Sequence, residues 1–197
     1  RHYPPEPRKT PIPSDVCGES PDFFKFFKEQ QYNRRSLNDE DKTLHTLFNK
    51  EFVERGTSGT YVELGAYNGR AESNTRFFHE CLGWQGILIE ANPLIYNALV
   101  RNRPNDYRFS YSPTCTILEE LNNKTVAFHS IDATTAGMEG SALRHMGQAH
   151  VKVPCGTLTS LLTEVFPNGH VDFFSLDVEN AEPEVVENLD FDQVFIE

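Results

Sequence analysis

Short apolar runs alternate with amphipathic segments along the chain from Thr60 onward. Runs of about five apolar residues predict strands, and segments with apolar residues at helical spacing predict helices. The expected strands are YVELG, GILIE, YRFSY, TVAFHSI (in a hairpin), VKVP, VDFFSLD and QVFIE, and the expected helices cover residues 72–82, 93–101, 157–165 and 183–187. Strands that alternate with helices are typical of a doubly wound α/β fold with a mostly parallel sheet and helices on both faces.

The first 59 residues have a different pattern. Six of the twelve prolines fall within residues 1–21, which predicts an extended arm outside the core because proline disfavours regular structure. Four phenylalanines between Phe23 and Phe27 form an apolar patch, and Asp39 is placed to cap a helix that ends at Gly56. The chain is therefore divided into a Pro-rich arm (1–21), a helical segment (22–59) and an α/β domain (60–197).

Composition narrows the class of protein. The 197 residues carry a formal net charge of -11, and 38% of them are hydrophobic, so the chain can build a core. An acidic chain repels nucleic-acid phosphates, which argues against a nucleic-acid partner. No apolar run approaches the roughly 18 residues that a membrane-spanning helix needs.

The four cysteines lie far apart and form no CxxC pair, which disfavours a zinc or redox motif, and no residue is assigned as a metal ligand. Cys115 and Cys155 follow segments that should be neighbours near the sheet edge, and we expect them to form a disulfide if the protein is secreted. The triplet Asn123-Lys124-Thr125 is a glycosylation sequon in a polar turn. The sequence leaves the cytoplasm and the secretory lumen equally open.

The first strand of the α/β domain ends in a glycine-containing turn, Glu63-Leu64-Gly65-Ala66-Tyr67-Asn68-Gly69. Glycines let a ligand approach the backbone, so a side chain at Gly65 should intrude on a bound ligand. The spacing ExGxxxG differs from the GxGxxG of dinucleotide-dependent oxidoreductases, which makes that class less favoured. The alternative is a turn that needs glycine for its shape alone.

Two further acidic positions follow strands. Glu90 ends the second strand, where a carboxylate can accept both hydroxyls of a ribose, although a solvated strand-end Glu is the alternative. Asp177 and Glu179 alternate along an expected extended chain and should point to one face, where they could take a proton, bind a metal or orient a hydroxyl. Phe173 and Phe174 should lower the dielectric around Asp177.

Four blocks in order, YVELGAYNG, ESNT, LGWQGILIEANP and VDFFSLDVENAEPEVVENLDF, resemble the motifs of the FkbM-type methyltransferases over residues 60–197. The resemblance implies a Rossmann-like methyltransferase fold that binds S-adenosylmethionine and methylates hydroxyl oxygens of sugars or other small metabolites. It also implies Asp177 and Glu179 at the reaction centre, and it assigns the cofactor site to Glu63, Gly65, Ala66, Gly69, Ser73, Asn74, Thr75, Glu90 and Asn92.

The chain departs from the family pattern in two places. Asn180 stands where the family usually has the glycine of DVEG, although asparagine tolerates a left-handed backbone. QVFIE is the expected fifth strand, after which the family's sheet normally continues with two more strands, so the last strands are expected to be missing. Residues 193–197 would then form an exposed edge open to an oligomer or another partner.

The sequence therefore predicts an oxygen-directed, S-adenosylmethionine-dependent methyltransferase that acts on a small-molecule acceptor such as a carbohydrate. Asp177 is the expected base, with His129 and His150 as alternatives. Variable loops such as residues 134–148 should bind the acceptor. The alternative function is a catalytically inactive methyltransferase-fold interaction module, secretory or membrane-anchored.

Overall fold

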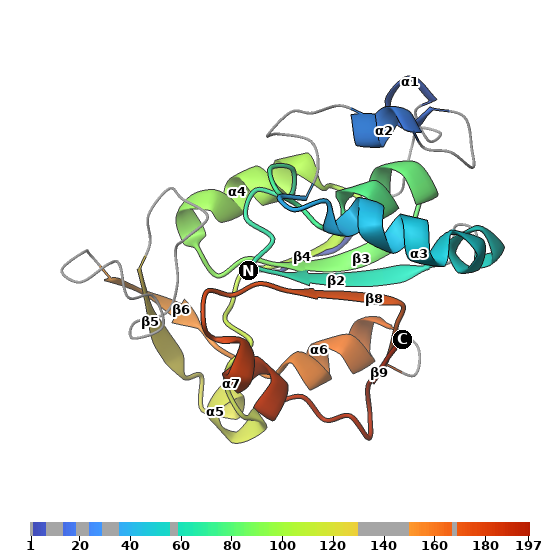
Figure 1. Cartoon of the computed structure of the whole chain (residues 1–197). Helices are drawn as coiled ribbons and strands as arrows, with labels where there is room; N and C mark the ends of the chain where they lie inside the picture. Colours follow the sequence, from blue (N-terminus) through green and yellow to red (C-terminus); the bar gives the residue numbers. More distant parts are fainter. Residues whose placement is uncertain are drawn as a thin grey trace.

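The computed structural model describes residues 2–6, 14–18, 24–28, 36–55, 59–129, 150–166 and 169–197. Its centre is a five-stranded sheet in the order β1-β4-β3-β2-β8 (Figure 1). Strands β2, β3, β4 and β8 are parallel, and β1 pairs with β4 in the antiparallel sense. The bounds are β1 His2–Tyr3, β2 Thr60–Leu64, β3 Gln85–Ile89, β4 Tyr107–Phe109 and β8 Phe173–Leu176. The expected mostly parallel α/β sheet is confirmed.

Two smaller sheets complete the strands. The expected hairpin is formed by β5 (Thr125–His129) and β6 (His150–Pro154), and residues 130–131 of the expected strand lie outside the described residues. The segment VDFFSLD is divided at Asp172 into β7 (His170–Val171) and β8. The strand expected at QVFIE is reduced to β9 (Phe195–Ile196), which pairs in parallel with β7.

Helices cover both faces of the central sheet, as Figure 1 shows with α3 and α4 on one side and α6 and α7 on the other. Successive residues of β2 point to opposite faces, so Tyr61 packs in one apolar cluster and Val62 in the other. The helices are α1 Ser14–Cys17, α2 Phe24–Lys28, α3 Glu40–Arg55, α4 Pro93–Asn102, α5 Ile117–Leu121, α6 Leu158–Val165 and α7 Glu182–Glu187, with a π-helical segment η2 at Phe78–Leu82. Within the described part of the chain, no helix has the length and hydrophobicity needed to cross a bilayer.

The helix expected over residues 72–82 begins later than the apolar pattern indicated. Glu72 has a left-handed φ of 58°, and the main-chain N–H of Asn74 donates to the side chain of Glu63 instead of a helical carbonyl. The helical turns therefore start at Arg76. Residues 72–75 form a loop whose polar groups can contact Glu63 near the end of β2.

The expectation that residues 1–21 lie outside the core is wrong for part of this segment. Cys17 is only 1% exposed, belongs to the apolar cluster on one face of the sheet, and forms a disulfide with Cys81 of η2. Phe26 and Phe27 of α2 pack on Phe77 in the same cluster, while Phe23 and the side chain of Phe24, the rest of the expected apolar patch, lie outside the described residues. Residues 7–13, with three of the arm's six prolines, lie outside the described residues.

The expected disulfide between Cys115 and Cys155 is confirmed. It joins the segment after β4 to the end of β6, and the main-chain N–H of Cys115 also donates to Gly156. With the Cys17 and Cys81 pair, every cysteine of the chain is in a disulfide. The two bridges fasten the N-terminal helices and the hairpin to the central domain.

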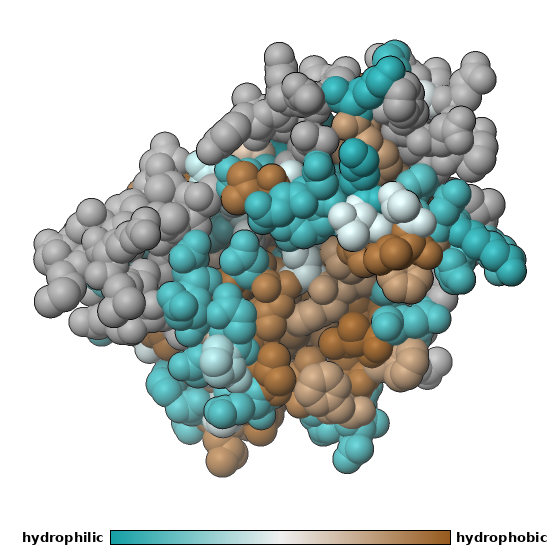
Figure 2. All heavy atoms as spheres, in the orientation of Figure 1, coloured by the Kyte–Doolittle hydropathy of each residue, from teal (hydrophilic) through white to brown (hydrophobic). Residues whose placement is uncertain are grey.

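The edge of the sheet at β8 is bordered by apolar side chains. Phe173, Phe174 and Leu176 are only partly buried, and Figure 2 shows brown and tan residues between the α3 layer and the α6 and α7 layer, where β8 runs. A partner or second copy at residues 193–197 stays a prediction.

We expect the double substitution Cys17→Ser and Cys81→Ser to lower the free energy of unfolding by about 4 kcal/mol, because the bridge closes a loop of 64 residues in the unfolded chain. Urea unfolding followed by tryptophan fluorescence under non-reducing conditions measures the change. The double variant Cys115→Ser and Cys155→Ser, whose bridge spans 40 residues, should lose slightly less. An unchanged midpoint for the first variant would contradict the anchoring role.

Candidate functional site

A cavity of about 250 Å³ lies at the carboxyl ends of β2, β3 and β8. This is the edge of an open parallel sheet at which ligands bind. Seven of the residues predicted for the site line it: Glu63, Gly65, Ala66, Ser73, Glu90, Asp177 and Glu179. The other four, Gly69, Asn74, Thr75 and Asn92, do not line it, and their contacts show how they shape its walls.

Glu63 holds the loop that follows β2. Its buried carboxylate accepts hydrogen bonds from Ser73 Oγ at 2.8 Å, from the main-chain N of Asn74 at 2.7 Å and from Thr75 Oγ1 at 2.6 Å. Burial raises the pKa of Glu63, while Arg103 and these hydrogen bonds act in the opposite direction. The side chains of Ser73 and Thr75 are therefore engaged within the protein and fix the cavity floor.

A buried ionic network that the sequence reasoning missed supports the same loop. Arg103 Nε donates to Asp106 Oδ2 at 2.8 Å, and its Nη atoms donate to Ser73 Oγ and Thr75 Oγ1, both at 3.2 Å. Burial opposes ionisation of Asp106, but His79 and Arg103 hold the pKa of this carboxyl well below its usual range. An Arg beside a Pro after a helix gives no sequence signal for this role.

Tyr61 joins the network from β2. Its hydroxyl donates to Asp106 Oδ1 at 2.6 Å and accepts from Arg103 Nη2 at 2.7 Å. The network thus connects β2, the end of α4 and the loop of residues 72–75 beside the cavity.

The two predicted glycines are required by packing inside the protein. Both have a left-handed φ, 76° at Gly65 and 72° at Gly69. A Cβ at Gly65 would lie 1.8 Å from the carbonyl oxygen of Asp177, and a Cβ at Gly69 would lie 2.6 Å from Arg103 Cγ. The crowding atom at Gly65 belongs to the turn after β8, so this glycine is needed for packing inside the protein, and the predicted intrusion of a side chain on a ligand stays a prediction.

Glu90 is a buried carboxylate on the cavity wall, only 7% exposed. Its Oε2 accepts from the main-chain N of Tyr67 at 2.8 Å, and its Oε1 accepts from that of Asn92 at 2.6 Å. Burial raises the pKa of Glu90 to about 7, although both hydrogen bonds favour the ionised form. Asn92 also caps α4, because its side chain accepts from the main-chain N of Leu94.

Asp177 and Glu179 reach the cavity through a turn and not through an extended strand. Strand β8 ends at Leu176, and Glu179 and Asn180 have left-handed φ values of 54° and 70°. The expected alternation along an extended chain is therefore wrong, although both carboxylates line the same cavity. The tolerance expected of Asn180 for a left-handed backbone is confirmed.

Asp177 is exposed at the rim of the cavity. Partial burial of its carboxylate raises its pKa, and the negative charges of Glu182 and Glu40 add to the shift. Phe173 and Phe174, expected to cause this shift, belong to the two apolar clusters on opposite faces of the sheet. Burial is therefore the largest cause of the raised pKa of Asp177, the charges of Glu182 and Glu40 are additional causes that the sequence did not indicate, and the contribution of the two phenylalanines stays a prediction.

Among the lining residues that were not selected from the sequence are Leu37, Tyr111, Ser112, Pro113, Thr114 and Phe128. The Tyr111 hydroxyl is buried and makes no hydrogen bond with the described part of the chain. Its position at the carboxyl end of the expected strand YRFSY was the sequence signal that could have indicated a place in the site. The predicted acceptor loop, residues 134–148, lies outside the described residues.

Residues 63–197, more than half of the chain and including every predicted site residue, match the model of the Methyltransferase FkbM domain. The chain belongs to the FkbM methyltransferase family. No curated protein and no solved structure matches it. The family match and the mostly parallel sheet agree with a Rossmann-like methyltransferase fold.

The alternative bases do not line the cavity of this FkbM domain where the structure describes them. His129 is buried in β5, and its pairing partner in the hairpin is His150. The His150 side chain lies outside the described part of the structure.

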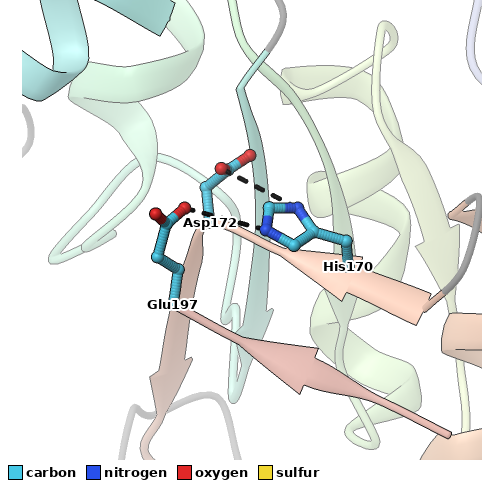
Figure 3. Close-up of side chains that lie close together, drawn as sticks. All are labelled: His170, Asp172 and Glu197. Carbon is cyan, nitrogen blue, oxygen red and sulfur yellow. Dashed lines mark ion pairs between the residues drawn. The ribbon is translucent and has the colours of Figure 1, made fainter.

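A second group of titratable side chains lies at the amino end of the FkbM sheet, away from the cavity (Figure 3). His170 Nδ1 lies 3.9 Å from Asp172 Oδ1, and His170 Nε2 lies 3.7 Å from Glu197 Oε2. Asp172 is held in place because its Oδ2 accepts from the main-chain N of Thr60 at 2.6 Å. The two ring nitrogens of His170 therefore face different carboxylates.

We expect Gly65→Ala in the FkbM domain to lower the free energy of unfolding by more than about 2 kcal/mol, because a left-handed backbone at a residue with a Cβ costs about 1–2 kcal/mol and the clash with Asp177 adds to it. Chemical denaturation measures this. Gly83→Ala is the control, because Gly83 has the same φ of 75° and the described residues place no crowding atom near its Cβ. Equal losses in the two variants would contradict the contact with Asp177.

Proposed function

We propose that this chain binds S-adenosylmethionine and transfers its methyl group to a hydroxyl oxygen of a small-molecule acceptor such as a carbohydrate. The proposal rests chiefly on Glu90, a buried carboxylate that faces the cavity from the carboxyl end of β3. The family match supports a methyltransferase, and the geometry of this carboxylate supports the donor.

Glu90 is suited to a ribose. Each of its oxygens accepts one main-chain N–H, from Tyr67 or Asn92, which fixes the carboxylate and leaves acceptor capacity on both atoms. Its pKa of about 7 reflects burial without a charged partner, so uncharged hydroxyl donors match it better than a cation would. A diol can give one hydrogen bond to each oxygen.

The remaining cofactor residues act in two ways. Glu63, Gly65, Ala66 and Ser73 line the cavity and would face the methionine part of the donor. Asn74 and Thr75 act through Glu63, Gly69 through its contact with Arg103, and Asn92 through Glu90. Substitutions in this second group would change the shape of the site and not a direct contact.

The bound donor supplies an electrophilic methyl carbon, and the chain must hold the acceptor oxygen in line with it and exclude water. Asp177 takes the proton from the acceptor hydroxyl, since its raised pKa makes it a stronger base than an ordinary aspartate. Glu179 orients the same hydroxyl from the adjacent turn. Tyr111, which also lines the cavity, offers its buried hydroxyl to another oxygen of the acceptor.

We expect Glu90→Ala to weaken S-adenosylmethionine binding by about 1–3 kcal/mol, because the ribose hydroxyls lose their charged acceptor. Titration calorimetry on the folded protein measures this. Glu164→Ala, which removes an exposed carboxylate of α6 away from the cavity, should leave the affinity unchanged. Unchanged affinity for Glu90→Ala would refute the assignment, and no binding by the folded parent would favour an inactive interaction module.

The same titration has an expected pH dependence. Glu90 loses its proton as the pH rises through about 7, and the ionised form accepts both hydroxyls, so the affinity should fall as the pH decreases below 7. The fall should approach about tenfold per pH unit if only the ionised form binds. Glu90→Gln should lose this dependence.

We expect Asp177→Asn to reduce methyl transfer by about 10²–10⁴-fold while cofactor affinity changes little, because the substitution keeps the shape and removes the basic oxygen. Turnover on an acceptor found by screening glycans with the parent enzyme measures this effect. Asp192→Asn, at an exposed position outside the cavity, is the matched control. Full turnover by Asp177→Asn would place the base elsewhere.

A further inference from the structure

The sequon Asn123-Lys124-Thr125 lies in the turn that connects α5 to β5. All three side chains are exposed, and Asn123 has a left-handed φ of 53°. Figure 1 places α5 at the lower margin of the molecule, away from α3 and α4. An enzyme that modifies this triplet could therefore approach it from solvent.

The hydrogen bonds of this turn do not engage the two side chains that a glycosyl-transferring enzyme must recognise. The main-chain N of Asn123 donates to the carbonyl of Glu120 at 2.8 Å, and that of Lys124 donates to the carbonyl of Glu119 at 3.0 Å. Lys124 Nζ pairs with Glu119. Among the described residues, no hydrogen bond involves the Asn123 amide group or the Thr125 hydroxyl, so the turn holds its shape without them.

The helix before the sequon is unusually apolar for its exposure. Ile117, Leu118 and Leu121 of α5 are 49%, 69% and 70% exposed, and no residue of this helix is buried. Leu121 is two residues from Asn123. A bulky hydrophilic glycan on Asn123 would cover part of this surface, which water would otherwise contact.

The disulfides give an independent argument for the same cellular route. All four cysteines are paired, and the carbonyl of Lys124 accepts from the main-chain N of Cys155, so one bridge lies next to the sequon turn. Disulfides persist in oxidising compartments and are rare in a reducing cytosol. N-linked glycosylation takes place in such a compartment.

We propose that Asn123 carries an N-linked glycan and that the chain matures in an oxidising secretory compartment. In this reaction the Asn123 side-chain nitrogen forms a bond to C1 of the first sugar of a lipid-diphosphate oligosaccharide. The bond between C1 and the diphosphate oxygen breaks, the lipid diphosphate leaves, and the amide nitrogen gives up one proton. Each cysteine pair passes two electrons and two protons to a disulfide-donating oxidoreductase of the same compartment.

The test uses the full-length protein expressed from its complete coding sequence in cultured eukaryotic cells. Glycopeptide mass spectrometry, before and after treatment with a peptide N-glycosidase, should find a glycan on Asn123 and conversion of this residue to aspartate on removal. Non-reducing peptide mapping of the same sample should find both disulfides. We expect Asn123→Gln and Thr125→Ala to abolish the glycan, because the first removes the nitrogen and the second the recognised hydroxyl.

Two variants act as matched controls. Thr125→Ser keeps the hydroxyl and should keep the glycan, and Asn122→Gln changes the neighbouring exposed asparagine, which is in no sequon, and should also keep it. Unmodified Asn123 in parent protein that contains both disulfides would overturn the glycosylation site. Four free thiols in the parent would overturn the proposed compartment.

Discussion

The charge pair of Arg103 and Asp106 determines where the loop beneath the cavity can lie. Both side chains are buried, so either one left alone in the interior would cost about 3–5 kcal/mol. The pair is fixed on one side by Tyr61 of β2 and on the other by the hydroxyls of Ser73 and Thr75. Because Glu63 accepts from the same two hydroxyls, its position on the cavity wall depends on charges deeper in the fold.

Residues before the α/β domain also help to position the cavity loop. Cys17, Phe26 and Phe27 pack in the same apolar cluster as Phe77, on one face of the sheet. Ser36 forms a β-bridge with Glu72 at the cavity loop. Leu37 even contributes to the cavity wall. The family match begins at residue 63, yet the described structure uses earlier residues to close the site.

The fold was predictable because its strands and helices are encoded locally. The apolar runs that became β2 and β3 are buried on both faces, and the run that became β8 packs against both apolar clusters. Such runs are read directly from a sequence. Glu63, Glu90 and Asp177 were found for a related reason, since polar residues at the carboxyl ends of parallel strands meet at one edge.

The features that the sequence did not predict depend on tertiary contacts and on the shape of the backbone in turns. Arg103 reaches the cavity loop through Ser73 and Thr75, which are far away in sequence. Tyr111 lines a cavity that distant segments build, and Cys17 lies in an arm whose prolines suggested an extended chain. The strand-like pattern at Asp177 and Glu179 predicted correctly that both residues line one cavity, but it predicted an extended backbone. The chain turns there instead, because Glu179 and Asn180 both have a left-handed φ. Periodicity describes the interior of elements and carries little information about the turns that end them.

The close approach of Gly65 to the carbonyl of Asp177 has a consequence for how the cavity can change. The turn after β2 and the turn after β8 are in contact at this point, where the main-chain N of Asp177 also donates to the carbonyl of Leu64. The glycine turn and the turn with the carboxylates therefore cannot move independently of each other. A sequence that acquired a side chain at position 65 would need a compensating shift in the turn at 177–180 to remain folded. The two halves of the site are therefore constrained to vary together, even though 112 residues separate them along the chain.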